Sequence, residues 1–287
     1  MVKSKRRIFG EYVGRVAPTP TGLMHLGHAC TFLEAQRRAR AAGGKLLLRI
    51  EDLDQARCKP EFVEALAEDL AWAGLSWEPE VLRQSERLAW FREVLGRLRE
   101  AGVVYPCSCS RKDVAEAIRA PHVEGQEPLY PGTCREREFV FGSEAEALAI
   151  NWRFRVPDGE AIAFEDGRLG AQHFVAGRDF GDFLVWRKDG FPSYELAVVA
   201  DDVAQGITEV VRGEDLLAST ARQLLLYRAL GEEPPAFYHC PLILDTEGKR
   251  LAKRAGAMGL RELRAGGARP EELEEIAKRG GRLRGGA

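Results

Sequence analysis

Two histidines three positions apart, His25 and His28, lie in the stretch Pro18–His28 and have the residue type and spacing to act on an anion. Two prolines and a glycine precede His25, so the sequence predicts a tight, preset loop. A helix is expected to begin near Leu26, with its free N–H groups and positive dipole end facing the loop. This pattern is typical of a phosphate site, although a proline-rich turn with partly buried histidines explains the same spacing.

A second candidate segment is basic and lies near the other end of the chain, between Gly248 and Gly256. Chemistry at an α-phosphate needs positive charge on the leaving pyrophosphate and donors for the pentavalent oxygens. Lys253 would supply that charge opposite the two histidines, whereas Lys253 taken alone is more simply a solvated surface lysine. Together, the histidine loop and the basic loop predict two sides of one nucleotide site.

A third candidate site is a metal centre. Cys107 and Cys109 offer two soft ligands close together, and Cys134 offers a third. Zinc usually takes four ligands, mostly cysteine and histidine. His122 is the conventional fourth ligand and Tyr130 an unusual one, so the residues alone leave that choice open. Free thiols without a metal are the simpler alternative.

The composition is that of an ordinary globular protein. The 287 residues, 45% of them hydrophobic and 30% charged, suffice for one large or two ordinary domains. The net charge of −2 is uneven, because residues 248–287 carry eleven Lys and Arg against five Asp and Glu. A basic tail suits an anionic partner such as nucleic acid, although a solvated charged helix is commoner. The six cysteines are scattered, and neither a targeting signal nor a membrane-spanning apolar run is present, so the sequence predicts a cytoplasmic protein without membrane contact.

The elements that position the histidine loop form a predicted strand–helix–strand unit. Strand formers over 11–17, a helix ending at Gly43-Gly44 and an apolar run over 45–50 give this order. A βαβ unit implies an α/β fold with a right-handed crossover, and ligands of such sheets bind beyond the carboxyl ends of the strands. Arg15 and Glu51 belong to that edge.

The middle third of the chain has a different pattern. Helices predicted over 60–73 and 85–101 lead to alternating, antiparallel-type strands over 151–156, 161–164 and 183–186. This region predicts an insertion with its own small β structure. The α/β pattern resumes at Tyr194, with a strand over 207–211, a helix over 219–230 that Ser219 or Thr220 caps, and a last strand over 242–244.

The two loops carry a family resemblance. The segment His25–His28 resembles the HIGH signature of class I aminoacyl-tRNA synthetases, and Arg250–Arg254 resembles their KMSKS loop. The basic loop departs from that motif at Arg250 and Ala252 but keeps Lys253. Three further segments are similar to the glutamyl branch of this class, namely 15–22, 49–54 and 200–215.

The resemblance, which extends over residues 14–256, implies the fold and the reaction. Only about thirty residues follow the basic loop, too few for the large anticodon-binding region of full glutamyl-tRNA synthetases. The chain therefore resembles the short members of the branch, the glutamyl-Q tRNA(Asp) synthetases. These enzymes activate glutamate with ATP and transfer it to the queuosine base of tRNA(Asp). We expect a Rossmann-type parallel-sheet catalytic domain with an inserted zinc-binding β subdomain, no anticodon-binding domain, and a monomer.

Glutamate, an α-amino dicarboxylic acid, needs a cation for each carboxylate and an anion for its ammonium group. Arg15 and Arg212 offer guanidinium groups for the carboxylates, and Glu51 can hold the ammonium. The alternative for Arg15 and Glu51 is a structural ion pair. The glutamate site implied by the resemblance comprises Arg15, Ala17, Thr19, Glu51, Tyr194 and Arg212.

The resemblance also implies the ATP and metal sites. His25, His28 and Lys253 are the expected catalytic residues, with Arg250 as a further ATP contact and Mg²⁺ accompanying the ATP. One structural Zn²⁺ is expected, and the family pattern favours Tyr130 over His122. The implied ligands are Cys107, Cys109, Tyr130 and Cys134.

Four segments are expected to divide these tasks. They are the first catalytic half over 8–103, an inserted zinc-binding and tRNA-contacting subdomain over 104–190, the second catalytic half over 191–260, and a short basic C-terminal segment over 261–287. Two other functions stay open. One is a truncated glutamyl-tRNA synthetase that charges a tRNA 3′ end. The other is an inactive RNA-binding paralogue, which Arg250 and Ala252 motivate.

Overall fold

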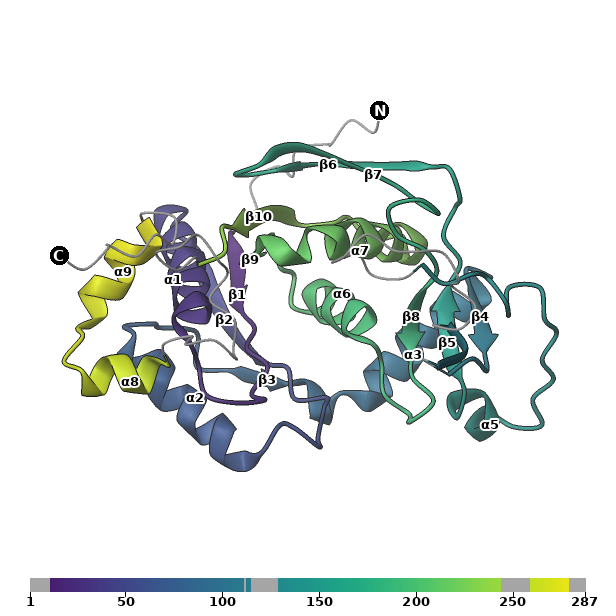
Figure 1. Cartoon of the computed structure of the whole chain (residues 1–287), viewed down its shortest axis with the longest axis horizontal. Helices are drawn as coiled ribbons and strands as arrows, with labels where there is room; N and C mark the ends of the chain where they lie inside the picture. Colours follow the sequence, from purple (N-terminus) through teal and green to yellow (C-terminus); the bar gives the residue numbers. More distant parts are fainter. Residues whose placement is uncertain (1–10, 111, 115–128, 244–258, 279–287) are drawn as a thin grey trace. The chain divides into compact units, whose positions relative to one another are not determined.

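The computed structural model describes residues 11–110, 112–114, 129–243 and 259–278 (Figure 1). Arg250, Lys253 and His122 lie outside these ranges. Contacts divide the chain into two compact units, which are described separately below. The first unit comprises Met1–Arg83, Gly206–Glu214 and Pro235–Ala287, and the second comprises Gln84–Gln205 and Asp215–Pro234. The four functional segments expected from the sequence follow motifs rather than contacts and stay a prediction.

The first unit opens with the predicted strand–helix–strand order. Strand β1 (Val13–Val16), helix α1 (Leu26–Ala41) and strand β2 (Lys45–Ile50) follow one another, and β1 pairs with β2 in parallel. Gly44 permits the tight return from α1, because a Cβ there would meet the backbone of Tyr12, whose carbonyl carbon lies 2.9 Å away. The predicted βαβ unit is confirmed.

The same sheet continues after a second helix. Helix α2 (Pro60–Trp72) has proline in its first turn, where the missing N–H costs nothing, and it ends before Gly74, whose φ is 78°. Strand β3 (Val81–Arg83) then pairs in parallel with β2, giving the order β1-β2-β3. The helix predicted over 60–73 is confirmed.

The last strand of the first unit differs from the prediction. Strand β9 (Glu209–Gly213) pairs in parallel with β10 (Ala236–Cys240). The strand predicted over 242–244 is wrong, because residues 241–243 form no strand and Leu244 lies outside the described chain. The sequence pattern does not predict β10, because one of its fully buried side chains is the polar His239, which interrupts the apolar pattern.

Two C-terminal helices belong to the first unit. Helices α8 (Leu260–Ala265) and α9 (Pro270–Lys278) contribute the buried residues Leu260 and Leu273 to the same hydrophobic cluster as α1. Residues 259–278 carry four basic and five acidic side chains, so the positive charge of the tail is concentrated outside the described residues. The described part of the C-terminal segment packs against helix α1 through this cluster.

Helix α1 is attached to β9 through one carboxylate. Arg38 donates two hydrogen bonds to Glu209, at 2.6 and 2.7 Å, and the Tyr12 hydroxyl donates a third at 2.8 Å. The backbone strengthens this junction, since the Thr208 N–H donates to the Val13 carbonyl at 2.9 Å. These contacts fix the helix whose first turn carries the two histidines.

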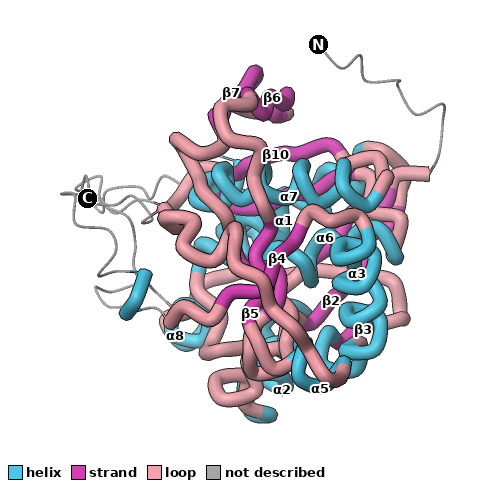
Figure 2. The backbone as a smooth tube through the Cα atoms, turned by 90° about the vertical axis from the view of Figure 1, so that its right-hand side faces the viewer, coloured by secondary structure: helices cyan, strands magenta, loops and turns pink. Residues whose placement is uncertain are grey.

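The second unit contains the predicted antiparallel strands (Figure 2). Strands β4 (Val104–Cys107), β5 (Asn151–Phe154) and β8 (Phe183–Trp186) form an antiparallel sheet in the order β4-β5-β8. Strands β6 (Ala161–Asp166) and β7 (Gly170–Val175) of this unit pair with each other in antiparallel orientation. A short helix α5 (Glu144–Leu148) precedes β5.

Three longer helices complete the second unit: α3 (Leu88–Glu100), α6 (Tyr194–Ala204) and α7 (Leu217–Leu230). Asp201 on α6 is buried and accepts hydrogen bonds from Gln84 at 3.0 Å and from Arg87 at 2.7 Å. The acidic pair of the family motif at 201–202 thus begins with a structural carboxylate.

Two predicted helix starts are wrong in detail. Helix α3 begins at Leu88 rather than Ser85, because Gln84–Glu86 form a separate 3-10 turn. Helix α7 begins at Leu217, and no side chain caps it; Ser219 and Thr220 are buried within its first turn. Across the described residues, no helix is both long and apolar enough to cross a membrane.

Candidate active site and metal centre

The structure brings the two histidines of the predicted nucleotide site together. His25 is the N-cap residue of α1, in extended backbone conformation, and its ring stacks on that of His28 with centroids 3.7 Å apart. Gly27 makes room for this arrangement, because a Cβ there would lie 3.2 Å from the His25 imidazole. The first turn of α1 contains no acidic residue, so its positive end faces the loop without competition from a local carboxylate.

Residues on both sides of the basic segment lie close to the turn formed by His25–His28, called the histidine turn below. Before that segment, Ile243 Cγ1 lies 3.7 Å from the position that a Cβ would take at Gly27. After it, Gly259 forms an antiparallel bridge with His25, and the Leu260 N–H donates to the Met24 carbonyl at 2.9 Å. Residues 244–258, with Arg250 and Lys253, lie outside the described chain. The two described residues that flank this segment, Ile243 and Gly259, therefore lie beside the histidines.

Two predicted glutamate ligands are buried arginines on the strands of the first unit. Arg15 lies on β1, and its Nη1 donates to the Val211 carbonyl at 3.0 Å. Arg212 lies on β9, and its Nε donates to His239 Nε2 at 3.2 Å. The guanidinium of Arg212 also lies 5.6 Å from the ring centroid of Phe237. Both guanidinium groups are thus held by fixed partners on neighbouring strands.

The predicted ammonium ligand, Glu51, directly follows β2. Its carboxylate pairs with the fully buried Arg49 at 3.2 Å, and its backbone N–H donates to the Pro18 carbonyl at 3.0 Å. Glu51 is therefore joined to the loop that begins the histidine stretch. Ala17 is half-buried and Thr19 is exposed, and the Thr19 carbonyl accepts the Thr21 N–H in a turn at 2.9 Å.

Tyr194, the remaining predicted glutamate ligand, belongs to the second unit. It is the first residue of α6 and is 38% exposed, next to the N-cap residue Ser193, whose hydroxyl accepts the Leu196 N–H at 3.3 Å. The cap fixes the start of the helix and with it the position of Tyr194.

Sequence reasoning missed two residues that hold these side chains. Arg49 carried a signal, since a charged residue two positions before Glu51 interrupts the apolar run of β2. His239 had a weaker signal in the sequence, because its partner Arg212 is 27 positions away. Both are fully buried polar side chains, and a buried polar group needs a partner.

The predicted metal ligands meet in the second unit. The sulfur atoms of Cys107, Cys109 and Cys134 all lie within 4.8 Å of one another, and those of Cys109 and Cys134 are 3.5 Å apart. The Tyr130 hydroxyl lies 3.4 Å from Cys107 Sγ and 3.5 Å from Cys109 Sγ. A tetrahedral zinc ion with ordinary bond lengths would separate sulfur atoms by about 3.8 Å and sulfur from oxygen by about 3.5 Å. The four donors therefore fit one zinc ion.

Hydrogen bonding distinguishes the thiols of this cluster. Burial raises the pKa of Cys134, but hydrogen bonds from the Tyr130 hydroxyl and the Ser108 backbone outweigh it and lower that pKa to about 6. Burial raises the pKa of Cys109 to about 11. The Cys134 thiol is thus more readily ionised than that of Cys109, and ionised thiols are the form that binds a metal.

Comparison with known proteins identifies the family of the chain. The family described as "tRNA synthetases class I (E and Q), catalytic domain" matches residues 11–284. A glutamyl-Q tRNA(Asp) synthetase of Symbiobacterium thermophilum is 49% identical over 91% of this chain and 83% of its own length. One from Rhodobacter capsulatus is 42% identical over 92% of this chain and 99% of its own length.

A solved structure shows the same architecture. The glutamate tRNA ligase of Elizabethkingia meningosepticum, crystallised with its amino acid, matches with a TM-score of 0.73 and 29% identity over 89% of this chain. This chain spans about half of that ligase, 53% of its length. The parallel sheet is that of an α/β class I synthetase catalytic domain. The chain belongs to the class I (E and Q) tRNA synthetase family and, within it, to the glutamyl-Q tRNA(Asp) synthetases.

Proposed function

We propose that this chain activates glutamate with ATP, without tRNA, and transfers the glutamyl group to the queuosine base of tRNA(Asp). The name of its relatives at 49% and 42% identity supports this activity. The structural observation that supports it most is the position of the two residues that flank the basic segment. Ile243 and Gly259, which flank the segment that carries Lys253, both lie beside the turn that holds the two imidazoles.

Activation joins a carboxylate oxygen of glutamate to the α-phosphorus of ATP while the bond to pyrophosphate breaks. His25 and His28 donate hydrogen bonds to the charged oxygens at the start of α1, where the helix dipole also favours negative charge. The family motif assigns Lys253 and Arg250 to the ATP phosphates. Mg²⁺ accompanies ATP as part of the substrate.

Glutamate is held by the buried charges at the edge of the first unit. Arg15 and Arg212 pair with its carboxylates, and Glu51 takes the ammonium group. Their support is the fixed contacts to Val211, His239 and Arg49 described above. The remaining contacts of this proposal come from the backbone of Ala17 and Thr19 and from the Tyr194 hydroxyl.

Transfer uses the adenylate, a mixed carboxylic–phosphoric anhydride, as the activated glutamyl donor. A hydroxyl on the cyclopentene ring of queuosine attacks the glutamyl carbonyl, a new ester bond forms, and AMP leaves with the electrons of the broken bond. We propose that the inserted subdomain and the basic tail contact tRNA mainly through its phosphates. The enzyme would work as a cytoplasmic monomer.

Cys107, Cys109, Tyr130 and Cys134 would hold one structural zinc ion, whose chemistry is to fix the chain segments that bear its ligands. The fit of the four donor atoms to tetrahedral separations supports this assignment. A four-ligand centre leaves no position for substrate, so no step of glutamate transfer is assigned to the metal.

The decisive experiment incubates the protein with ATP, radiolabelled glutamate and tRNA(Asp), with and without queuosine. We expect label only on the queuosine-containing tRNA(Asp), in the nuclease fragment that holds the anticodon. Matched reactions contain tRNA(Glu), and ATP–pyrophosphate exchange is measured with no tRNA. Exchange that requires tRNA(Glu), or label on its 3′ end, would identify a truncated glutamyl-tRNA synthetase. Absence of exchange at every glutamate concentration would identify an inactive paralogue.

A further inference from the structure

A buried arginine contacts two of the proposed metal ligands. Arg153 lies on β5 and is 9% exposed. Its Nε donates to Cys107 Sγ at 3.3 Å, and its guanidinium carbon lies 3.8 Å from the centroid of the Tyr130 ring. Its Nη1 donates to the Asp182 carbonyl at 3.0 Å. One planar group therefore touches ligands from two separate segments of the chain.

We propose that Arg153 is the positioning residue of the metal centre, a role that rests on the zinc site proposed above. The guanidinium fixes the Cys107 sulfur and the Tyr130 ring at the separation a single ion requires. Its charge also offsets the excess negative charge that three thiolates leave on a divalent cation. Residues that donate to metal ligands in this way commonly set the affinity of the centre.

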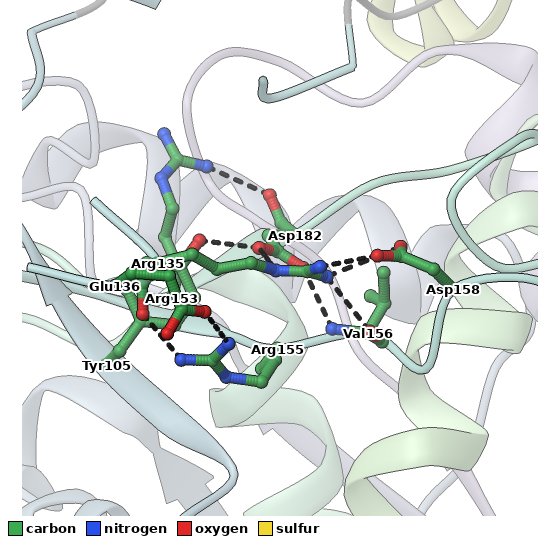
Figure 3. A network of polar contacts seen from close by, with 8 residues as sticks. All are labelled: Tyr105, Arg135, Glu136, Arg153, Arg155, Val156, Asp158 and Asp182. Atoms are coloured by element: carbon green, nitrogen blue, oxygen red, sulfur yellow. Dashed lines mark hydrogen bonds and ion pairs between the residues drawn. The ribbon is translucent and has the colours of Figure 1, made fainter. Parts of the chain in front are cut away.

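The surroundings of Arg153 are rigid enough for this role (Figure 3). The buried carboxylate of Asp182 accepts hydrogen bonds from the Tyr105 hydroxyl at 2.5 Å, from Arg135 Nε at 2.7 Å and from the Val156 N–H at 2.8 Å. Tyr105 stands two residues before Cys107, and Arg135 directly follows Cys134. Asp182 thus ties the ligand-bearing segments to the backbone that holds Arg153.

The chemistry of arginine explains why this residue stands there. A buried cation needs compensating charge or several acceptors, and Arg153 has a sulfur, a carbonyl oxygen and an aromatic face. A lysine would keep the charge, but its compact ammonium group lacks the planar fork that spans all three contacts. We therefore expect charge alone to preserve only part of the function.

The test compares zinc binding by the parent protein, Arg153→Lys and Arg153→Met. Zinc per chain is measured on the purified proteins, and zinc affinity by competition with a coloured chelator. We expect on the order of 10- to 100-fold weaker binding by Arg153→Met, with Arg153→Lys between it and the parent. Cobalt substitution adds a spectroscopic check, since displaced ligands should weaken the sulfur-to-cobalt charge-transfer band.

Arg99→Met is the matched control. Arg99 also stacks on an aromatic ring, with its guanidinium carbon 4.8 Å from the centroid of Trp152, but it pairs with Glu144 instead of a cysteine. Equal zinc affinity of Arg153→Met and the parent would overturn the proposal. If Arg153→Met does not fold, the rate of zinc release from Arg153→Lys decides in its place. A parent without stoichiometric zinc would refute the metal centre and leave the glutamate activity to its own assay.

Discussion

Replacing His239 by alanine should weaken glutamate binding through Arg212. His239 is fully buried on β10, and its Nε2 accepts a hydrogen bond from Arg212 Nε at 3.2 Å. A hydrogen bond to a charged group contributes about 1.5–3 kcal/mol, and each 1.4 kcal/mol is a factor of about ten. If Arg212 binds a carboxylate of glutamate, the KM for glutamate in His239→Ala should rise roughly 10- to 150-fold.

The assay is ATP–pyrophosphate exchange without tRNA, with glutamate and ATP varied separately. The KM for ATP should change little, because Arg212 is assigned to glutamate and the histidine turn to ATP. His239→Gln, which keeps an acceptor, should restore part of the glutamate affinity. The control is His173→Ala, since His173 is an exposed residue of β7.

Three outcomes would contradict the role of His239 in holding Arg212 for glutamate. An unchanged KM for glutamate in His239→Ala would remove His239 from the glutamate site. Equal increases in both KM values would indicate a general loss of structure, which the thermal unfolding temperature would reveal independently. A larger defect in His239→Gln than in His239→Ala would mean that packing, and not the accepted hydrogen bond, is what Arg212 requires.

Three other predictions concern stability and ionisation. Gly44→Ala should lower the unfolding free energy by ~1–3 kcal/mol, because its Cβ would lie 2.5 Å from that of Tyr12; denaturant melts measure this. Asp182→Asn should cost ~3–5 kcal/mol in the same assay, because it leaves Arg135 short of a buried carboxylate. In metal-free protein, thiolate absorbance should titrate with a midpoint near pH 6 owing to Cys134.

Each of these predictions has a matched control. Gly96→Ala, at a helical position with nothing within 4 Å of the new Cβ, should be neutral or stabilising. Asp189→Asn removes an exposed carboxylate that pairs with Arg187, and should change stability little. Cys134→Ser should abolish the titration near pH 6, whereas persistence of that step would assign it to another group.

The sign of the Cys134 effect on stability follows from linkage. Its folded pKa, about 6, lies below its ordinary value of 9.0. The thiolate therefore stabilises the metal-free fold fully above about pH 9, and this contribution is lost as the pH falls through about 6. A metal-free protein whose stability does not decline across that interval, relative to Cys134→Ser, would contradict the assignment.

The sequence predicted the elements whose signals are local. The strand over Lys45–Ile50 was bounded correctly because an apolar run lies between a glycine pair and a charged residue. The start of α1 at Leu26 followed from the proline-rich loop before it. Strand β10 was missed because its pairing partner β9 lies across a helix in the sequence, and one of its buried side chains is a histidine. Buried polar positions depend on distant partners, which no local pattern reports.

In the candidate sites too, the residues with a local sequence signal are predictable and those that depend on distant partners are not. Cys107 and Cys109 are visible as a spacing, but the residues alone could not separate Tyr130 from His122 as the fourth ligand. The structure brings the Tyr130 hydroxyl to 3.4 and 3.5 Å from two of the sulfurs, while His122 lies outside the described chain. Arg153 could not be predicted at all, because nothing near it in the sequence suggests a cysteine as its partner.

Three arginines near the candidate sites share one physical design. Arg49, Arg153 and Arg212 are all buried, and each is held by a partner on its own or a neighbouring segment: Glu51, Cys107 and His239. Ordering a long side chain costs up to about 2 kcal/mol of conformational entropy, and a free guanidinium would incur that cost on binding. In this fold the side chains are already ordered during folding, by contacts that keep the guanidinium groups charged. If Arg212 pairs with a carboxylate of glutamate, as proposed above, selectivity for a dicarboxylic amino acid follows from a charge that is already fixed before the substrate arrives.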